Sequence, residues 1–486
     1  MNSAAANASS RRTPRAEEGH GSGQRVLFQA ADGMELQGAV LHLSRHAITF
    51  ELLQPDAALR ASEVLGGFKI FAGEDPIYFG RAVVSGIVHA GTALHVEVKL
   101  GAPEAESAVF LPVANAANTR TGYEQFFQGW QKEYRIAPEF KVLVVDIAAY
   151  LSGIRQWLEQ EDFKQRASGK PWQPEQEREL FDDILKAFGH QHERFEELAY
   201  LIPPELYGAH QEFVRRHWHD LFLCAPFAQR TFFKPLGYAG DYEMMNMIHR
   251  NQPEGRSLYE KMIHLLLVSQ LPAQSVRNRI AHLKTRLVSE TARVARSGRR
   301  ARILNVGCGP ARELQDFFQE SDLSHEADCT LLDFNQETLD HAAARIDDLR
   351  RKHSRRARVS TVNLSVNQLL RRAIRQGHLG LDGNFDLIYC GGLFDYLADG
   401  TCAELVHLFH DSLLPGGLVV AANMVDVDDQ GIKEFRNFIE FTLDWQLIYR
   451  QAGVIEQFIP PHSREHARVF AEPEFVNLFL HVRKPD

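Results

Sequence analysis

Hydrophobic positions repeat with different periods along the chain and divide it into three parts. Residues 25–112 contain short runs rich in Val, Ile and Phe, such as MELQGAVLHLS and ALHVEVKL, which Gly, Asp and Pro separate at nearly regular intervals. This pattern is typical of a small antiparallel β-barrel. Residues 113–297 repeat apolar residues at helical spacing, as in ELFDDILKAFGHQHERFEELAYLI, so we expect a set of helices there.

Strand-like and helix-like runs alternate from residue 298 to residue 486. ARILNVG, ADCTLLDFN, ARVSTVNLS and FDLIYCGG read as strands, and a helical run follows each of them. This alternation predicts an α/β domain with a parallel sheet and helices on both of its faces. The final run FVNLFLHVRK predicts one more strand, at an edge of the sheet. Residues 1–24 are small and polar, which predicts a disordered tail.

A glycine turn separates the first strand of this sheet from the helix after it. Gly307 and Gly309 bracket Cys308 in the run ILNVGCGPARELQDFF. Glycine lets the backbone bend sharply and lets a ligand approach without a Cβ in the way. The start of the next helix presents unpaired N–H groups and a positive dipole end. The turn therefore suits a polar or anionic group of a ligand at the carboxyl edge of the sheet.

The residues around the turn separate two kinds of ligand. A dinucleotide fingerprint would carry a third glycine where this sequence has Arg312. S-adenosylmethionine has no pyrophosphate, so a G-x-G turn is sufficient for it. Asp333 ends the next predicted strand, CTLLDF, where a carboxylate can accept hydrogen bonds from both ribose hydroxyls. The next strand is followed by Asn363, Leu364 and Ser365, placed where an adenine edge would be read. The strand after it is followed by Gly391 and Gly392, a turn that lets the methionine end and the substrate approach.

Residues 300–425 resemble a class I S-adenosylmethionine-dependent methyltransferase, which has a Rossmann-like fold. NVGCGPARE is similar to the first motif of that family, LLDFN to its ribose-acid motif, and FDLIYCGGLFDYL and LLPGG to its later motifs. The resemblance implies that Gly307 and Gly309 line the amino-acid end of the cofactor, that Asp333 holds the ribose and that Phe334 flanks the adenine. The expected cofactor-binding residues are Gly307, Cys308, Gly309, Asp333, Phe334, Asn335, Asn363, Leu364, Cys390 and Gly391.

A second unusual run, TFFKPLGYAGDYEMMNMI, lies at residues 231–248, before the α/β part. Together with the methyltransferase motifs it resembles the bacterial synthases of 3-hydroxypalmitic acid methyl ester, a quorum-sensing autoinducer. The resemblance covers roughly residues 120–486 and implies carboxyl O-methylation of a 3-hydroxy fatty acid. On this interpretation the run folds over the cofactor, and Lys234 and Asp241 contact the substrate. The alternative is a tight turn with buried tyrosines in a helical linker.

A carboxylate acceptor needs little base catalysis because it is already ionised at neutral pH. We therefore expect alignment and exclusion of water rather than a catalytic triad. Tyr238, Tyr242 and Tyr396 are the candidates for orienting the acceptor. Asp395 is a candidate base if the acceptor is instead a hydroxyl or amine of another small metabolite, or else a cap of the next helix.

The predicted barrel weakly resembles a PilZ domain, a family that often binds cyclic di-GMP. In LHLSRHAITFEL only Ser44 matches the second motif of that family, because His42 and Ala47 replace its acid or amide and its glycine. Arg11 and Arg15 have the spacing of its arginine motif, and arginine forks suit guanine and phosphate. We expect a barrel that binds no nucleotide or that contacts protein; a nucleotide-sensing regulator built on a methyltransferase scaffold is the alternative class.

Composition narrows the class of protein further. The net charge of −9 argues against a large nucleic-acid footprint. The five cysteines contain no CxxC pair, which suits a reducing cytoplasm better than a disulfide framework. The N-terminus lacks the apolar core of a signal peptide, and no apolar stretch reaches the roughly 18 residues of a transmembrane helix. The histidines show no metal-ligand spacing. We therefore expect a cytoplasmic enzyme that acts on a small molecule without a metal.

Overall fold

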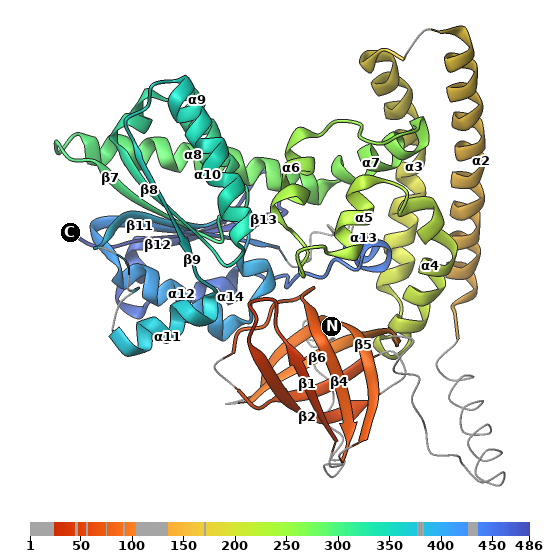
Figure 1. Ribbon diagram of the computed structural model, residues 1–486, viewed down its shortest axis with the longest axis horizontal. Helices are drawn as coiled ribbons and strands as arrows, with labels where there is room; N and C mark the ends of the chain where they lie inside the picture. The colour runs from red at the N-terminus through yellow and green to blue at the C-terminus, as the bar shows by residue number, and fades with distance from the viewer. Residues whose placement is uncertain are drawn as a thin grey trace, which may run out of the picture.

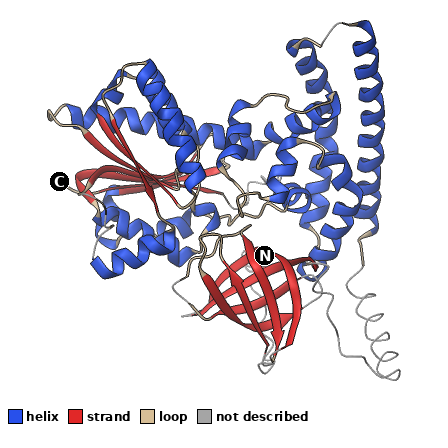
Figure 2. Ribbon diagram, viewed as in Figure 1, coloured by secondary structure: helices blue, strands red, loops and turns tan. Residues whose placement is uncertain are grey.

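The computed structural model describes residues 24–43, 47–54, 57–73, 75–90, 93–103, 135–169, 172–376, 379, 381, 383–425 and 436–486. Three parts are visible in Figure 1: a barrel, a group of helices that includes two long antiparallel ones, and an α/β sheet. In Figure 2, which colours helices blue and strands red, the barrel is made of strands, the α/β part has a red sheet with blue helices around it, and the third part is all blue helices. The predicted tail, Ser44, Arg11 and Arg15 lie outside the described residues, as does most of the helical run at 123–136.

The N-terminal part is a closed barrel of six strands, as the regularly spaced short apolar runs predicted. Neighbouring strands follow the order β1-β2-β3-β6-β5-β4, and every described pair is antiparallel. Alternate side chains point inward, and three phenylalanines, Phe28, Phe50 and Phe68, meet at its centre with ring centroids 5.4–6.2 Å apart. The strands are β1 (Gln24–Gln29), β2 (Glu35–Leu43), β3 (Ala47–Leu52), β4 (Val64–Ala72), β5 (Asp75–Ala90) and β6 (Ala93–Pro103).

The central part is a helical bundle with one apolar core. The breaks between its helices fall at the Pro203-Pro204 and Gly255-Arg256 pairs, since proline and glycine both disfavour continuation of a helix. The helices are α2 (Pro138–Ser168), α3 (Pro174–Tyr200), α4 (Tyr207–Phe222), α5 (Pro226–Phe233), α6 (Tyr242–Arg250), α7 (Leu258–Val268) and α8 (Leu271–Ala295), with the 3-10 turn η2 (Pro204–Leu206) before α4.

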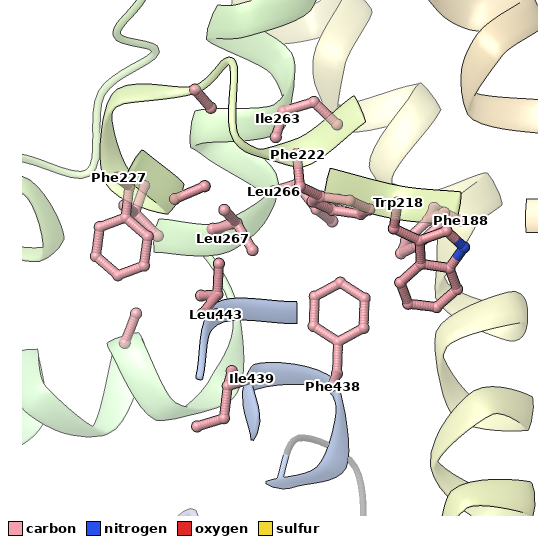
Figure 3. Packing of buried hydrophobic residues seen from close by; sticks show 14 of the residues in the cluster. Phe188, Trp218, Phe222, Phe227, Ile263, Leu266, Leu267, Phe438, Ile439 and Leu443 are labelled. Atoms are coloured by element: carbon pink, nitrogen blue, oxygen red, sulfur yellow. The ribbon is translucent and has the colours of Figure 1, made fainter. Parts of the chain in front are cut away.

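A helix from the C-terminal part of the chain completes this bundle. Figure 3 shows Phe438, Ile439 and Leu443 of α13 (Arg436–Leu443) packed among Trp218, Phe222 and other side chains of the bundle. The ring of Phe438 lies 5.9 Å from that of Trp218 and 5.6 Å from that of Phe222. The carboxylate of Glu196 accepts hydrogen bonds from the backbone N–H groups of Asn437 (3.0 Å) and Phe438 (2.7 Å). The sequence pattern did not predict α13 as part of the helical core.

The C-terminal part is a seven-stranded sheet in the order β12-β13-β11-β10-β7-β8-β9. Strands β7 (Ala301–Val306), β8 (Ala327–Asp333), β9 (Arg358–Asn363), β10 (Phe385–Cys390) and β11 (Leu413–Met424) are parallel, and β13 (Asn477–Arg483) is antiparallel to its neighbours. The predicted edge position of the last strand is wrong, because β12 (Ala467–Ala471) covers it. The nearly continuous burial of β13 is typical of an interior strand.

Helices cover both faces of the sheet, as predicted. One face packs against the second half of α8 and against α9 (Arg312–Glu320) and α10 (Gln336–Lys352). The other face packs against α11 (Val366–Gln376), α12 (Asp399–Asp411) and α14 (Ala452–Glu456). The first half of α8 belongs to the helical bundle, so this one helix connects the two cores. The short 3-10 turns η3 (Asp322–Glu326), η4 (Phe394–Tyr396) and η5 (Pro461–His466) lie between these elements.

The barrel packs against the carboxyl edge of the sheet through the segment between β3 and β4. The backbone N–H of Ala61 donates to the carbonyl of Tyr396 at 2.9 Å, and that of Val64 donates to the carbonyl of Gly237 at 2.8 Å. A second contact joins the β1–β2 turn to α11, where the amide of Asn367 donates to Asp32 at 3.1 Å. The barrel is thus hydrogen-bonded to both other parts of the chain.

Candidate active site

A cavity lies where the three parts of the chain meet, at the carboxyl ends of β7, β8 and β10. It encloses about 1320 Å³ of space free of atoms, part of which is open to solvent. We call it the edge cavity. Its walls come from the barrel (Arg60, Ala61), the 238–245 run, α8, the glycine turn, the ends of β8 and β10, and the segment 445–447.

The glycine turn adopts a backbone shape that needs glycine. Gly307 and Gly309 have φ values of 64° and 51°. The N–H groups of Gly307 and Cys308 both donate to the carbonyl of Leu332, which ties the turn to the end of β8. A Cβ on Gly307 would lie 3.3 Å from the Cβ of Leu393, whereas a Cβ on Gly309 would meet open space. The turn therefore leaves its backbone accessible on the cavity side.

Asp333 stands at the end of β8, facing this turn. One carboxylate oxygen accepts from the backbone N–H of Gly309 at 3.2 Å, and the other accepts from that of Asn335 at 3.0 Å. Burial raises the pKa of Asp333, and the two hydrogen bonds and the charge of Arg60 oppose that rise. The carboxylate thus has a fixed orientation at the wall of the edge cavity.

A second buried acid, Glu313, lies in the first turn of α9. Its Oε1 accepts hydrogen bonds from the amide of Asn305 at 2.9 Å and from the hydroxyl of Tyr389 at 2.7 Å. Burial raises the pKa of Glu313 to about 7. Asn305, Glu313 and Tyr389 all line the edge cavity. An acid with this pKa can carry a negative charge when a cation lies beside it.

A buried ion pair between Arg279 of α8 and Asp395 of η4 forms another part of the wall. Nη1 of Arg279 donates to Oδ2 of Asp395 at 3.2 Å, and Oδ1 of Asp395 accepts from the backbone N–H of Met424 at 2.6 Å. The proposal that Asp395 caps the next helix is wrong. Its carboxylate is held by Arg279 and Met424 instead, and the N-cap position of α12 is Ala398.

Two of the three predicted tyrosines reach the edge cavity. The hydroxyl of Tyr396 accepts a hydrogen bond from the indole Nε1 of Trp445 at 3.0 Å. Tyr238 lies against Phe334, with ring centroids 5.0 Å apart, and its hydroxyl is 3.5 Å from that of Thr338. Burial raises the pKa of both tyrosines, so both hydroxyls stay protonated at neutral pH.

Most of the predicted cofactor residues lie at the wall of the edge cavity, and three do not. Gly307, Cys308, Gly309, Asp333, Phe334, Leu364 and Gly391 line it. Asn335 instead caps α10, where its side chain accepts from the N–H of Thr338 at 2.9 Å. The amide of Asn363 donates to the carbonyl of Phe334 at 3.0 Å. Cys390 is the last residue of β10 and is fully buried, away from the cavity wall.

The structure places the predicted substrate residues away from the edge cavity. The Nζ of Lys234 donates to the carbonyl of Asp444 at 3.0 Å and lies 3.5 Å from its carboxylate. Asp241 caps α6 by accepting from the N–H of Met244 at 2.9 Å, and it pairs with Arg230. The hydroxyl of Tyr242 donates to Glu337 at 2.8 Å. These side chains hold the 234–242 run in place around Tyr238 and Gly240.

Sequence reasoning missed several residues of the cavity wall. Asn305 and Glu313 belong to the quoted NVGCGPARE run, and a polar side chain within a buried strand was an available signal for Asn305. Arg279 lies in an ordinary amphipathic helix, and Arg60 lies between two barrel strands. No local pattern distinguishes these two arginines from surface arginines.

Comparisons with known proteins identify the α/β part. Residues 304–419 match the family model described as a methyltransferase domain. No curated protein matches the chain. A solved structure from Bordetella parapertussis, described as a possible exported protein, is 17% identical, with a TM-score of 0.40 over 63% of this chain and 97% of that chain.

Two methyltransferase structures also align with the chain. Magnesium protoporphyrin IX methyltransferase from Synechocystis PCC 6803, with bound S-adenosylhomocysteine, is 11% identical, with a TM-score of 0.32 over 50% of this chain and 95% of that one. The N-methyltransferase NodS from Bradyrhizobium japonicum is 14% identical, with a TM-score of 0.26 over 43% and 98%.

The matched domain and the cavity at its glycine turn agree with each other. The chain contains a methyltransferase domain with a Rossmann-like fold. Within the part of the chain that the structure describes, no helix combines the length and apolarity needed to cross a membrane.

Proposed function

We propose that this methyltransferase converts the carboxylate of a 3-hydroxy fatty acid into its methyl ester. The observation that carries the proposal is the composition of the edge cavity. Beside the glycine turn and Asp333, its remaining wall is mainly apolar and comes from the helical bundle and from β11: Met245, Val276, Ile280, Leu283, Met424, Trp445 and Leu447. Such a wall suits an alkyl chain, because an alkyl chain gains most of its binding affinity from the burial of apolar surface.

The residues of the cavity fit S-adenosylmethionine by charge as well as by shape. Asp333 would accept from the ribose hydroxyls, and Phe334 would lie beside the adenine. Arg279 carries a positive charge that suits the carboxylate of an amino acid, and Glu313, on the same wall, would become negatively charged beside the ammonium. When bound, the cofactor supplies an electrophilic methyl group. The protein then has to align the acceptor and keep water out.

The hydrogen bonds of the cavity favour an acceptor that is already ionised. Its three carboxylates, Glu313, Asp333 and Asp395, each accept hydrogen bonds from two protein donors. An acceptor carboxylate needs no base to remove a proton. Tyr396 would orient it: an indole N–H can only donate, so the hydroxyl of Tyr396 accepts from Trp445 and keeps its own proton for the substrate.

Methylation of a hydroxyl or an amine on another metabolite is the second candidate. One observation favours it: the pKa of Glu313, about 7, is suitable for a general base. Its two hydrogen bonds oppose this role. In the proposal, residues 113–297 act as the substrate-selecting cap, residues 25–112 as the barrel and residues 298–486 as the methyltransferase domain. The five cysteines are all free, which suits the expected cytoplasmic location.

A transfer assay with methyl-labelled S-adenosylmethionine tests the proposal. The full-length protein is incubated with 3-hydroxy fatty acids of graded length, with the matching unsubstituted acids and with small alcohols and amines. We expect label in a base-labile, organic-extractable ester, with the highest kcat/KM for one range of chain lengths. Label only in an alcohol or amine would support the second candidate. Cofactor binding without any transfer would contradict both and favour a sensing role for the barrel.

A further inference from the structure

The barrel contributes a charged side chain, Arg60, to the wall of the edge cavity. Its backbone position is held from two sides. The N–H of Arg60 donates to Oε2 of Glu63 at 2.9 Å, while Oε1 of Glu63 accepts from the N–H of Ala31 at 2.6 Å. The next residue, Ala61, donates to the carbonyl of Tyr396 at 2.9 Å. Arg60 therefore stands at a fixed point between the barrel and the end of the sheet.

The guanidinium of Arg60 lies over the aromatic side chain that follows Asp333. Its Cζ is 3.8 Å from the ring centroid of Phe334 and 5.6 Å from that of Tyr238. A guanidinium within about 6 Å of a ring face interacts favourably with it. The rings of Phe334 and Tyr238 meet edge to face, and the three side chains form one cluster at the cavity wall, where Asp333 also lies.

Within the described residues, this guanidinium has no hydrogen-bond acceptor. None of its N–H groups donates a hydrogen bond to any residue that the structure describes, and its nearest carboxylate, Glu63, is 3.9 Å from Nε. The side chain is only 11% exposed. The guanidinium therefore keeps only limited contact with water. A ligand in the cavity that brings acceptor atoms would supply hydrogen bonds to its N–H groups.

We propose that Arg60 is a cofactor-binding residue that closes the adenosine half of the site, so that the barrel is a required part of the methyltransferase. The inference rests on the proposed position of the adenosine beside Asp333 and Phe334. The planar face of Arg60 covers Phe334, and its free N–H groups meet acceptors of the nucleoside. The barrel then contributes to cofactor affinity without binding a nucleotide of its own.

Calorimetry on the full-length protein tests this role without turnover. Two ligands are titrated: S-adenosylhomocysteine, and 5′-methylthioadenosine, which lacks the amino-acid end. We expect Arg60→Ala to weaken both by the same factor, roughly three- to thirtyfold, because the hydrogen bonds from the guanidinium to the nucleoside are lost. Arg81→Ala is the matched control. Arg81 also joins the barrel to the helical bundle, through the carbonyl of Phe232 at 2.8 Å, but it does not line the cavity. We expect it to change neither affinity by more than about twofold.

The outcomes separate this inference from the proposed function. Unchanged affinity of Arg60→Ala, a loss confined to S-adenosylhomocysteine, or an equal loss in Arg81→Ala would each overturn it. Failure of the wild-type protein to bind either ligand would instead overturn the cofactor site itself. If Arg60→Ala does not fold, Arg60→Lys decides the question, because lysine keeps the charge and lacks the planar fork. We expect Arg60→Lys to lose at least threefold, and wild-type affinity in a folded Arg60→Lys protein would overturn the inference.

Discussion

The indole Nε1 of Trp445 donates a hydrogen bond to the hydroxyl of Tyr396 at 3.0 Å. This contact joins the turn after β10 to the segment that follows α13, and both residues line the edge cavity. Because the indole can only donate, the direction of the bond is determined and the tyrosine proton points elsewhere. The pair thus gives the cavity one oriented donor.

Replacing Tyr396 with phenylalanine should therefore affect the acceptor more than the cofactor. We expect Tyr396→Phe to lower kcat/KM by roughly tenfold, the value of one hydrogen bond to a charged group, about 1.5 kcal/mol. Calorimetry should show cofactor affinity within about twofold of wild type. Tyr242→Phe is the control, because the hydroxyl of Tyr242 bonds Glu337 outside the cavity. An equal loss in both variants would contradict the assigned role of Tyr396.

Asp333→Ala should weaken cofactor binding by at least about tenfold, or about 1.4 kcal/mol, because it removes the acceptor for the ribose hydroxyls. Calorimetry measures this directly. Asp328→Ala, on the same strand, removes a pair with Arg300 at 3.1 Å and does not touch the cavity. Its cofactor affinity should stay at the wild-type level. Wild-type affinity in Asp333→Ala would remove the ribose assignment.

Gly307→Ala should destabilise the fold more than Gly298→Ala, because an added Cβ at Gly298 would meet no atom within 4 Å. Gly307 and Gly298 both have positive φ values, 64° and 75°. Both variants therefore strain the backbone by about 1 kcal/mol. Only Gly307→Ala also forces a methyl group to 3.3 Å from Leu393. Urea unfolding should give a larger loss for Gly307→Ala, and equal losses would contradict the tight approach at the turn.

Glu313 should make stability depend on pH in a defined direction. Its folded pKa of about 7 lies above the unfolded value of 4.5, so the folded protein holds a proton that the unfolded chain has released. The contribution of Glu313 to the free energy of unfolding is fully present below pH 4.5 and is lost as the pH rises through 7. The total loss is up to about 3 kcal/mol. Glu313→Gln keeps an acceptor oxygen and cannot ionise.

Urea unfolding at pH 4.5, 6 and 8 tests this sign. The stability of Glu313→Gln relative to wild type should increase with pH across that range. Glu320→Gln is the control, because the side chain of Glu320 is half exposed and pairs with Lys284 at the surface. If the difference in free energy of unfolding between Glu313→Gln and wild type does not change with pH, the raised pKa of Glu313 is contradicted.

Asp444 should be important for the stability of the junction between the barrel and the helical bundle. Its carboxylate lies 2.7 Å from Arg215, 3.5 Å from Lys234 and 3.8 Å from Lys99 of the barrel. Burial lowers the pKa of both lysines to about 8, and the charge of Asp444 opposes that shift. At pH 7, Asp444→Ala leaves these cations without their carboxylate, and we expect a loss of about 3–5 kcal/mol.

The matched control for Asp444 is the exposed acid Asp182, which pairs with Arg178 at 3.1 Å on the surface of α3. Asp182→Ala should cost no more than about 0.5 kcal/mol in urea unfolding at the same pH. If the two variants lose similar free energies of unfolding, the ion pairs of Asp444 contribute no more to stability than an exposed pair does.

Local sequence patterns were sufficient to predict the features that depend only on the backbone conformation of a short segment. Short apolar runs separated by Gly, Asp and Pro predicted the barrel, and the strand–glycine–helix run placed Gly307 and Gly309 at the edge of the sheet. Asp333 could be predicted because parallel strands end at the same edge, so successive strand ends come together wherever the sheet forms.

Features that depend on contacts between distant segments could not be predicted in this way. Lys234 resembled a substrate residue, but it pairs with Asp444, which is 210 residues away in sequence. The run that forms α13 has the same local character as other amphipathic segments, and only packing assigns it to the helical core. The last strand lies inside the sheet because β12 pairs with its outer side.

The sequence by itself determined that the chain has a barrel, a helical part and an α/β sheet with a glycine turn, because these follow from local periodicity and backbone preference. Only the tertiary structure decided which side chains surround that turn. Arg60, Arg279 and Trp445 reach one cavity from three separate parts of the chain. Their position there depends on how the three parts pack together, and the local sequence around each of these residues does not predict that packing.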